Sequence, residues 1–250
     1  MVSNLPILSV IVPSFNQLAG LKRTADVFAG CSEVELIVVD GDSTDGSKGW
    51  LLENQRLFAK VISAPDRGVY DSMNKGLEIA SGSWCWFVGT GDMPVDGAVD
   101  EVLATVKMDT ESDLHAFNVR LLPPREPGVP EFYKPVWGES LKWRNTMHHQ
   151  GVVYRKSSVK KLGYDIRFRV LADYHLNLKL YMESAKCICH NTLIAEVEAG
   201  GVSRNFNRRL YAEERMMKRN VFGLSALTIA QEFTTRGKYL WKKFAAFRSK

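Results

Sequence analysis

A single carboxylate, Asp92, stands in a glycine-flanked turn directly after a short apolar run, Trp84 to Val88. A buried strand that delivers an acid to its carboxyl end is a common way for an open α/β sheet to build a ligand site. Mg²⁺ and Mn²⁺ prefer carboxylate oxygens, and such an ion could link Asp92 to the phosphates of a ligand. Because the turn holds one acid, water and the ligand would supply most of the coordination. The alternative is that Asp92 only closes the turn.

Polar side chains also follow the three apolar runs that come before this one. The runs span residues 8–12, 34–39 and 61–63, and the polar residues after them are Ser14 and Asn16, Asp40 and Asp42, and Asp66 and Arg67, respectively. Stretches with helical spacing separate the runs, and this alternation is typical of a mainly parallel sheet. Right-handed crossovers bring the loops after parallel strands to one edge. We therefore expect these groups to meet Asp92 at one binding edge.

The polar groups after the first two runs suit a nucleoside. Asp40 ends a buried strand, where an unpaired carboxylate is costly, and it could accept a hydrogen bond from a nucleobase. Ser14 and Asn16 could contact the base or the ribose. The alternative is that Asp40, Asp42 and Ser43 only complete the turn and cap the next helix.

Positive charge near the same edge comes from Arg67 and Lys75, and it suits a diphosphate. Either residue alone is more often a solvated surface cation. The whole chain has a net charge of +5, which favours phosphorylated ligands, polyanions or an anionic membrane surface without choosing among them.

The rest of the chain continues the α/β pattern. Helical spacing predicts helices over 17–29, 47–54, 70–80, 95–106, 156–162 and 169–181, and apolar runs predict strands over 114–119, 132–136, 187–190 and 193–197. In the stretch 147–154, two histidines come just before a further apolar, strand-like run. Four prolines interrupt residues 121–130, which indicates a loop or a boundary between half-domains. Two basic helices are expected from Arg208 onward.

Composition and length indicate a globular protein of one large domain, or of one domain with an appended segment, with 250 residues of which 45% are hydrophobic and 24% charged. No apolar run approaches the roughly 18–20 residues that cross a bilayer, and the first residues lack the pattern of a secretory signal. The four cysteines are scattered, so we expect reduced thiols in a cytosolic protein.

The last fifteen residues, Arg236–Lys250, hold six cations and no acid, interleaved with aromatic side chains. A basic amphipathic helix of this kind is a reasonable anchor on a membrane surface. The alternative is a helix that packs on the domain or on a second subunit, so homo-oligomerisation stays open. No nucleic-acid-binding motif accompanies the charge, and we expect no nucleic-acid partner.

Several stretches resemble, in order, the family 2 glycosyltransferases of GT-A fold. They are VIVPSFN, ELIVVDGDSTDGS, APDRGVYDSMNKGLEIASG, the strand ending in GTGD, and HHQGVVYRKSSVKKLGYD with VLADYHLNLKL, and they cover about residues 7–203. The resemblance implies a Rossmann-like, mostly parallel central sheet flanked by helices. It implies a catalytic domain over 1–205, with a nucleotide-binding half to about 120 and an acceptor half over 121–205. Residues 206–250 would form a basic helical extension.

The same resemblance implies roles for individual residues. The nucleotide-sugar-binding residues would be Pro13, Ser14, Asn16, Asp40, Asp42, Asp66, Arg67, Asn74, Lys75 and Gly91. Asp92 matches the last acid of the metal-binding D-x-D motif, and Asp173 matches the general base that deprotonates the acceptor. His149, Gln150 and Tyr174 would lie near the diphosphate or the acceptor.

This chain departs from the family pattern at two places. The D-x-D position reads Thr90-Gly91-Asp92, so only the final acid is present. His175 stands where an acid is commoner, so Asp173 is the lone base candidate. If the resemblance is set aside, Asp173 is equally well interpreted as an acid that stabilises the start of a helix through the helix dipole.

The activity implied is that of an inverting, hexosyltransferase-type glycosyltransferase in bacterial surface-polysaccharide synthesis. Its donor would be a UDP- or GDP-sugar, its cofactor Mn²⁺ or Mg²⁺, and its acceptor a glycan or a lipid-linked molecule. One base and no enzyme nucleophile predict a single displacement. The alternatives are a catalytically weak sugar-nucleotide-binding or scaffold subunit, and a nucleotidyltransferase. We expect a cytoplasmic location, with peripheral contact to the inner face of the cytoplasmic membrane.

Overall fold

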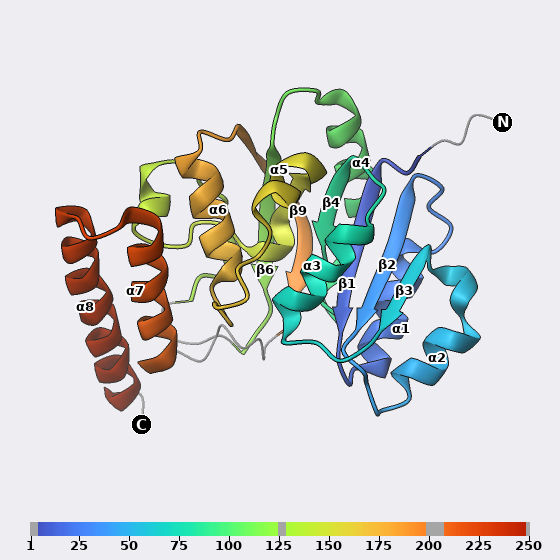
Figure 1. The fold of residues 1–250 in the computed structure, drawn as a ribbon, viewed down its shortest axis with the longest axis horizontal. Coiled ribbons are helices and arrows are strands. Elements are labelled where there is room, and N and C mark those ends of the chain that lie inside the picture. The colour runs from blue at the N-terminus through green and yellow to red at the C-terminus, as the bar shows by residue number, and fades with distance from the viewer. Residues whose placement is uncertain (1–4, 125–128, 199–207, 249–250) are drawn as a thin grey trace.

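A computed structural model of the chain describes residues 5–124, 129–198 and 208–248, with the side chains of the last helix as far as Tyr239. Within these residues, nine strands form one curled sheet in the order β3-β2-β1-β4-β8-β6-β9-β5, and β7 pairs with β6. Helices cover both faces of the sheet, and two further helices stand at one end of the molecule (Figure 1).

The first half of the chain forms the parallel part of the sheet. Its elements are β1 (Leu8–Ser14), α1 (Leu18–Phe28), β2 (Val34–Asp40), α2 (Ser47–Glu53), the 3₁₀ turn η1 (Gln55–Leu57), β3 (Lys60–Ser63), α3 (Val69–Ile79) and β4 (Trp84–Phe87). All four strands run parallel, as the alternation predicted. Every residue of β1 is buried, which explains the unbroken apolar run from Val10 to Pro13 in place of an alternating pattern.

The second half adds antiparallel pairs. Its elements are β5 (Met93–Pro94), α4 (Ala98–Met108), β6 (Leu114–Leu121), β7 (Phe132–Tyr133), η2 (Glu139–Lys142), η3 (His149–Gly151), β8 (Val152–Arg155), α5 (Lys156–Leu162), α6 (Ala172–Met182) and β9 (Cys187–Val197). Strand β8 lies antiparallel between β4 and β6. The two strands expected over 187–190 and 193–197 are one continuous strand, β9. Its register with β6 shifts part of the way along, and this irregularity makes one strand resemble two in the apolar pattern.

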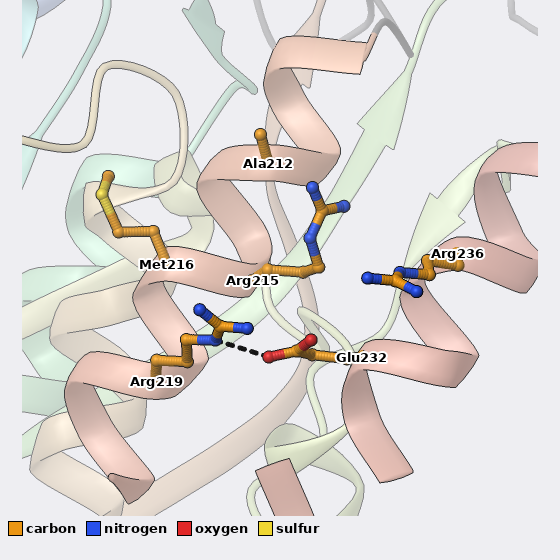
Figure 2. Close-up of a pocket in the computed structure, with 6 residues that line it drawn as sticks. All are labelled: Ala212, Arg215, Met216, Arg219, Glu232 and Arg236. Atoms are coloured by element: carbon orange, nitrogen blue, oxygen red, sulfur yellow. Dashed lines mark hydrogen bonds and ion pairs between the residues drawn. The ribbon is translucent and has the colours of Figure 1, made fainter. Parts of the chain in front are cut away.

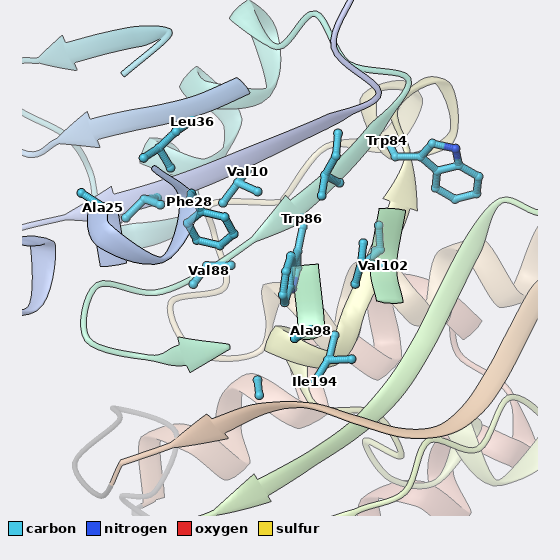
Figure 3. Close-up of a cluster of buried hydrophobic side chains, with 14 of the residues drawn as sticks. Val10, Ala25, Phe28, Leu36, Trp84, Trp86, Val88, Ala98, Val102 and Ile194 are labelled. Carbon is cyan, nitrogen blue, oxygen red and sulfur yellow. The ribbon is translucent and has the colours of Figure 1, made fainter. Parts of the chain in front are cut away.

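Two hydrophobic clusters lie on opposite faces of the sheet, because successive strand residues point to opposite sides. Val10 of β1 and Trp86 of β4 face α1 and α4, where the ring of Phe28 meets that of Trp86 edge-on at 6.0 Å (Figure 3). Ile11 and Phe87, their neighbours in sequence, face α3, α5 and α6. This packing fixes the ends of β1 and β4, where the candidate site lies.

The C-terminal helices α7 (Arg208–Phe222) and α8 (Ala226–Arg248) form a hairpin at one end of the fold (Figure 1). The buried Lys218 of α7 donates to Glu214 at 2.7 Å and to the backbone oxygen of Trp143 at 3.0 Å. Tyr239 packs on Tyr211. These contacts hold the hairpin against the segment that follows η2.

The membrane anchor was predicted partly from aromatic residues near the end of the chain. The side chains of three of them lie outside the described part: Trp241, Phe244 and Phe247. No helix within the described residues is long and apolar enough to span a membrane.

Candidate active site

A cavity of about 640 Å³ opens beside the carboxyl ends of β1 and β4. Ligand sites of open α/β sheets are expected at this edge. Five residues proposed from the sequence line the cavity: Pro13, Asp92, His149, Gln150 and Asp173. Ten others lie outside its lining: Ser14, Asn16, Asp40, Asp42, Asp66, Arg67, Asn74, Lys75, Gly91 and Tyr174. The cavity therefore brings together the residues proposed for metal binding and proton transfer, while most of the nucleoside-binding candidates lie outside its lining.

In the turn after β4, the Asp92 carboxylate lies against the backbone of Gly89. A Cβ atom at Gly89 would clash with Asp92 Oδ2, so glycine leaves the room that this conformation needs. Gly91 has a φ of +90°, which other residues rarely adopt. The Thr90 hydroxyl donates to the Pro13 carbonyl at 2.5 Å and ties the turn to β1. Gly89 and Gly91 are thus required by the conformation of the turn, and the sequence motif alone did not reveal this.

Gln150 connects Asp92 to the core. Its side-chain amide donates to Asp92 Oδ2, and its backbone oxygen accepts from the indole N–H of Trp86 at 2.8 Å. Trp86 is fully buried, so Gln150 holds the Asp92 carboxylate from a rigid position.

Asp92 fits a divalent metal as a single protein ligand. In the described residues, no group of three or more His, Cys, Asp and Glu side chains is arranged to hold a metal ion. Mg²⁺ is typically bound through one or two carboxylates, with waters and substrate phosphates in the remaining positions. The residues present therefore suit an ion that arrives with a phosphorylated ligand, and they do not form an all-protein metal cage.

Asp173 lies in the first turn of α6 and is buried. The Tyr70 hydroxyl lies 3.1 Å from Asp173 Oδ1 and donates to the Val170 carbonyl at 2.8 Å. Burial raises the pKa of Asp173, against the lowering effect of nearby His149 and of hydrogen bonds. A carboxyl whose pKa is raised toward neutrality is suited to accept a proton.

His149 lines the same cavity from η3. Neither of its ring nitrogens has a hydrogen-bond partner within the described part of the chain. Its ring packs near Phe87 and Tyr164, with centroids 6.3 and 6.5 Å away. Burial lowers the pKa of His149, although the charge of Asp173 opposes the effect. A neutral imidazole with two unpaired nitrogens is therefore available to a ligand in the cavity.

Asp40 and Asn16 hold the loops at the strand ends. The Asp40 carboxylate is fully buried and accepts hydrogen bonds from the Ser43 hydroxyl and backbone N–H and from the Ser63 hydroxyl, at 2.5–3.1 Å. Asn16 Oδ1 accepts from the Thr44 backbone N–H at 2.8 Å. These contacts agree with the turn-forming alternative, and they differ from the expectation that Asp40 binds the base directly.

The charged groups after β2 and β3 are paired with one another. Asp42 contacts Lys48 at 2.7 Å, whereas Arg67 and Lys75 both pair with Asp71, at 3.0 and 3.2 Å. The Arg67 side chain is 73% exposed, so it can still turn toward a ligand.

Asp66 lies against the loop after β2. Its carboxylate accepts from the Gly68 backbone N–H and the Ser72 hydroxyl. A Cβ atom at Gly41 would lie 2.5 Å from Asp66 Oδ2 and 3.3 Å from the ring of Phe15. The Asp66 carboxylate and the Phe15 ring therefore both lie close to the space that a Cβ atom of Gly41 would fill.

Asn74 and Tyr174, both proposed as site residues, lie outside the cavity lining and bond to the backbone of other segments. The Asn74 side chain donates to the Tyr164 carbonyl at 2.8 Å and accepts from the Tyr164 N–H at 2.9 Å. The Tyr174 hydroxyl donates to the Leu141 carbonyl at 2.6 Å, and the side chain is buried away from the cavity. Both residues hold the second half of the chain in position.

Sequence reasoning missed the contribution of the C-terminal hairpin. Leu210 of α7 lines the cavity. Glu213 of α7 accepts from the backbone N–H groups of Val170 and Leu171, at 2.8 and 2.7 Å, directly before α6. The helix α6 begins directly after this segment, at Ala172, three residues later than predicted. The hairpin thus positions the segment that carries Asp173.

Comparison with known sequences identifies the family. The profile described as Glycosyl transferase family 2 matches residues 9–110. A "PGL/p-HBAD biosynthesis glycosyltransferase" of Mycobacterium tuberculosis is 29% identical over 234 residues, 84% of this chain and 86% of that protein. An "uncharacterized glycosyltransferase" of the same organism is 33% identical over 185 residues, 70% of this chain and 68% of that protein.

Solved structures share the fold at low sequence identity. S. aureus TarS 1–349 in complex with UDP-GlcNAc aligns with a TM-score of 0.66 at 14% identity, over 94% of this chain and 81% of that one. This chain spans 43% of a longer TarS chain. The mannosyltransferase PcManGT from Pyrobaculum calidifontis, in complex with GDP-Man and Mn²⁺, aligns with a TM-score of 0.57 at 17% identity, over 94% and 65%. The fold, the cavity at the ends of β1 and β4 and the related sequences agree: the chain belongs to glycosyl transferase family 2 and is a glycosyltransferase with a GT-A fold.

Proposed function

We propose that the chain is an inverting glycosyltransferase that moves a sugar from a UDP- or GDP-sugar to a glycan or lipid-linked acceptor in surface-polysaccharide synthesis. The observation that carries the proposal is that Asp92, from the turn after β4, and Asp173, from α6, line one cavity. The names of the relatives support it, since one acts in PGL/p-HBAD biosynthesis and two fold neighbours were solved with UDP-GlcNAc and GDP-Man.

Asp173 would act as the general base. Its carboxylate would take the proton of an acceptor hydroxyl while that oxygen attacks the anomeric carbon. The bond from the anomeric carbon to the diphosphate oxygen breaks in the same step, and the nucleoside diphosphate leaves with the electron pair. A single displacement inverts the configuration of the anomeric carbon.

The diphosphate would lie toward Asp92. A divalent ion held by Asp92 would stabilise the negative charge that develops on the leaving group. Gln150 fixes the Asp92 carboxylate, and Arg169, which also lines the cavity, adds a positive charge. His149 offers unpaired ring nitrogens to the sugar or the phosphates.

The nucleobase would lie beside Phe15 and Asp66. The Phe15 side chain is 60% exposed although it is large and apolar, and it lines the cavity at the end of β1. The Asp66 carboxylate lies near this ring, since both are close to the space that a Cβ atom of Gly41 would fill. An exposed ring offers a stacking surface for a base, and a carboxylate accepts a base N–H.

A transfer assay tests this proposal. The purified full chain is incubated with each of several UDP- and GDP-sugars, Mn²⁺ and a bacterial lipid extract. We expect one donor to release its nucleoside diphosphate only when the extract is present, with the product showing the opposite anomeric configuration by NMR. A product of retained configuration would contradict inversion. Donor binding without any release would favour the catalytically weak binding subunit.

The α7–α8 hairpin would belong to the working enzyme, although residues 206–250 form an extension in sequence. We expect Glu213→Ala to lower kcat by about 10- to 100-fold, because the segment before α6 loses its two hydrogen bonds and Asp173 shifts. The KM for the donor should stay unchanged, since the donor would bind at β1 and β4.

Glu213→Gln is the matched variant, because its amide oxygen still accepts both N–H groups. It should restore most of kcat. Steady-state kinetics of both variants check this. Equal losses in the two variants, or a rise in donor KM, would contradict the positioning role.

We also propose that the enzyme works in the cytoplasm at the inner face of the membrane, where a lipid-linked acceptor is reached. The basic character of the C-terminal extension supports this location.

A further inference from the structure

A second hollow, of about 380 Å³, lies between α7 and α8, away from the active-site cavity. It is lined by Ala212, Arg215, Met216 and Arg219 of α7 and by Glu232 and Arg236 of α8 (Figure 2). The α7 residues recur at the three- and four-residue spacing of one helix face, and so do the two from α8. Figure 2 shows the guanidinium groups of Arg215 and Arg236 directed toward the space between the two helices.

The hollow carries an excess of positive charge. Glu232 is its one carboxylate, and it pairs with Arg219 at 2.5 Å. Within the described part of the chain, Arg215 and Arg236 form no ion pair. Glu232 also attracts Arg215 and Arg236. One carboxylate cannot balance three guanidinium groups, so the hollow keeps a net positive charge beside a solvent-accessible space. Their planar N–H donors match the oxygen geometry of a phosphate group.

Exposed apolar side chains stand on the same two helices as these arginines. Met216 is 49% exposed, Ile229 59% and Phe233 68%. Ile229 and Phe233 lie one turn of α8 before Glu232 and Arg236. The opposite face of α8 is already buried in the protein, as Thr228 and Thr235 show. The exposed apolar groups are therefore not required for docking the hairpin.

We propose that this hollow binds the phosphate of an anionic phospholipid headgroup, while Met216, Ile229 and Phe233 enter the interfacial region of the bilayer. Apolar side chains beside arginines are typical of helices that lie in a membrane interface. A free phosphate would use the arginines and leave the apolar groups exposed, so the lipid accounts for both features. The other side of α7 contributes Leu210 and Glu213 to the active site, so a bound hairpin would hold the cavity close to the membrane.

This inference rests on the membrane association proposed above and is independent of the transfer chemistry. The test is co-sedimentation of the full chain with vesicles of phosphatidylcholine, alone or mixed with phosphatidylglycerol. We compare wild type with Arg215→Gln/Arg236→Gln. The matched control is Arg56→Gln/Lys160→Gln, which removes the same charge from η1 and α5. Each cation near an anionic surface is worth about fivefold in binding, so the hairpin variant should bind the mixed vesicles about 30-fold more weakly.

Two further variants sharpen the test. Glu232→Gln removes the one carboxylate and releases Arg219, so it should tighten binding about fivefold. Inorganic phosphate is also added as a competitor for the vesicles. Phe233→Ser should weaken binding to mixed vesicles without changing how strongly inorganic phosphate competes. Thermal unfolding of each variant confirms that the hairpin still folds.

Three results would overturn the proposal. If wild type binds the mixed vesicles no better than phosphatidylcholine alone, both the lipid site and the membrane association fail. If the hairpin and control variants lose binding equally, the hollow is not the site, although the association stands. If inorganic phosphate competes fully and Phe233→Ser has no effect, the hollow takes a soluble anion. All three results are obtained without turnover, so they do not depend on the proposed transfer reaction.

Discussion

Asp173→Asn is expected to abolish sugar transfer and at the same time to raise the melting temperature. Loss of a general base lowers kcat by about 10²–10⁴-fold. Stability should rise because burial raises the pKa of Asp173, which means that the fold disfavours its charged form. Asparagine keeps the size and the acceptor oxygen near Tyr70 but carries no charge.

The effect of Asp173 on stability should depend on pH in a defined direction. Because its pKa in the folded protein is raised, the contribution of Asp173 to stability is fully present below the ordinary carboxyl pKa and is lost as pH rises through the raised value. The melting temperatures of wild type and Asp173→Asn should therefore converge in acid and separate toward neutral pH. Wild-type kcat should rise over the same interval, since the base must be deprotonated.

Asp100→Asn provides the matched control, because Asp100 is also an acid in the first turn of a helix, α4, but is exposed. If Asp173 served only the helix dipole, both variants would lose up to about 1 kcal/mol of stability and keep their activity. Differential scanning fluorimetry across pH, together with the transfer assay, decides between the two roles. A lower melting temperature for Asp173→Asn at neutral pH would contradict the base assignment.

Asp92→Ala is expected to remove the metal-dependent part of nucleotide binding. At a concentration of one hundred times Kd, a ligand stabilises the folded state by about 2.7 kcal/mol. For a chain of this size, that corresponds to a rise in melting temperature of about 5–10 °C. Wild type should show such a rise with either UDP or GDP in the presence of Mn²⁺, and CDP serves as a comparison. Asp92→Ala should lose it, because Asp92 is the single carboxylate that the turn after β4 offers.

The matched control for this variant is Asp96→Ala, an exposed acid four residues further along the chain. It should respond to nucleotide and Mn²⁺ as wild type does. A metal-dependent rise retained in Asp92→Ala would show that the ion is held elsewhere. No rise with any nucleotide in wild type would count against the nucleotide-sugar donor itself.

The parallel half of the sheet was predictable because its signals are local. A strand covered on both faces must be apolar at nearly every position, as β1 is, and a surface helix must be apolar at helical spacing, as α1 is. The short strand β5 and the antiparallel direction of β8 were not predictable. They are set by pairing with partners far away in the chain, such as β9 and β4, and a residue pattern does not encode strand direction.

The candidate site divides in the same way. The sequence placed Asp92 after a strand and Asp173 at a helix start, and the family resemblance related them to one reaction. Only the tertiary structure showed that the Asp40 carboxylate accepts hydrogen bonds from Ser43 and Ser63, because Ser63 lies on a neighbouring strand. A polar residue after a strand can face either a ligand or its own protein, and the pattern is the same in both cases.

The sequence by itself determined the strand–helix succession, the binding edge and the acids expected to work there, since each depends on residues close together in the chain. The tertiary structure decided which of these residues share a cavity and what holds them. Glu213 is the clearest case. It accepts two backbone N–H groups that lie more than forty residues before it, so its sequence context shows only a charged helix. Its role depends on how α7 packs beside α6, and hydrophobic packing over such a distance is not written in any local pattern.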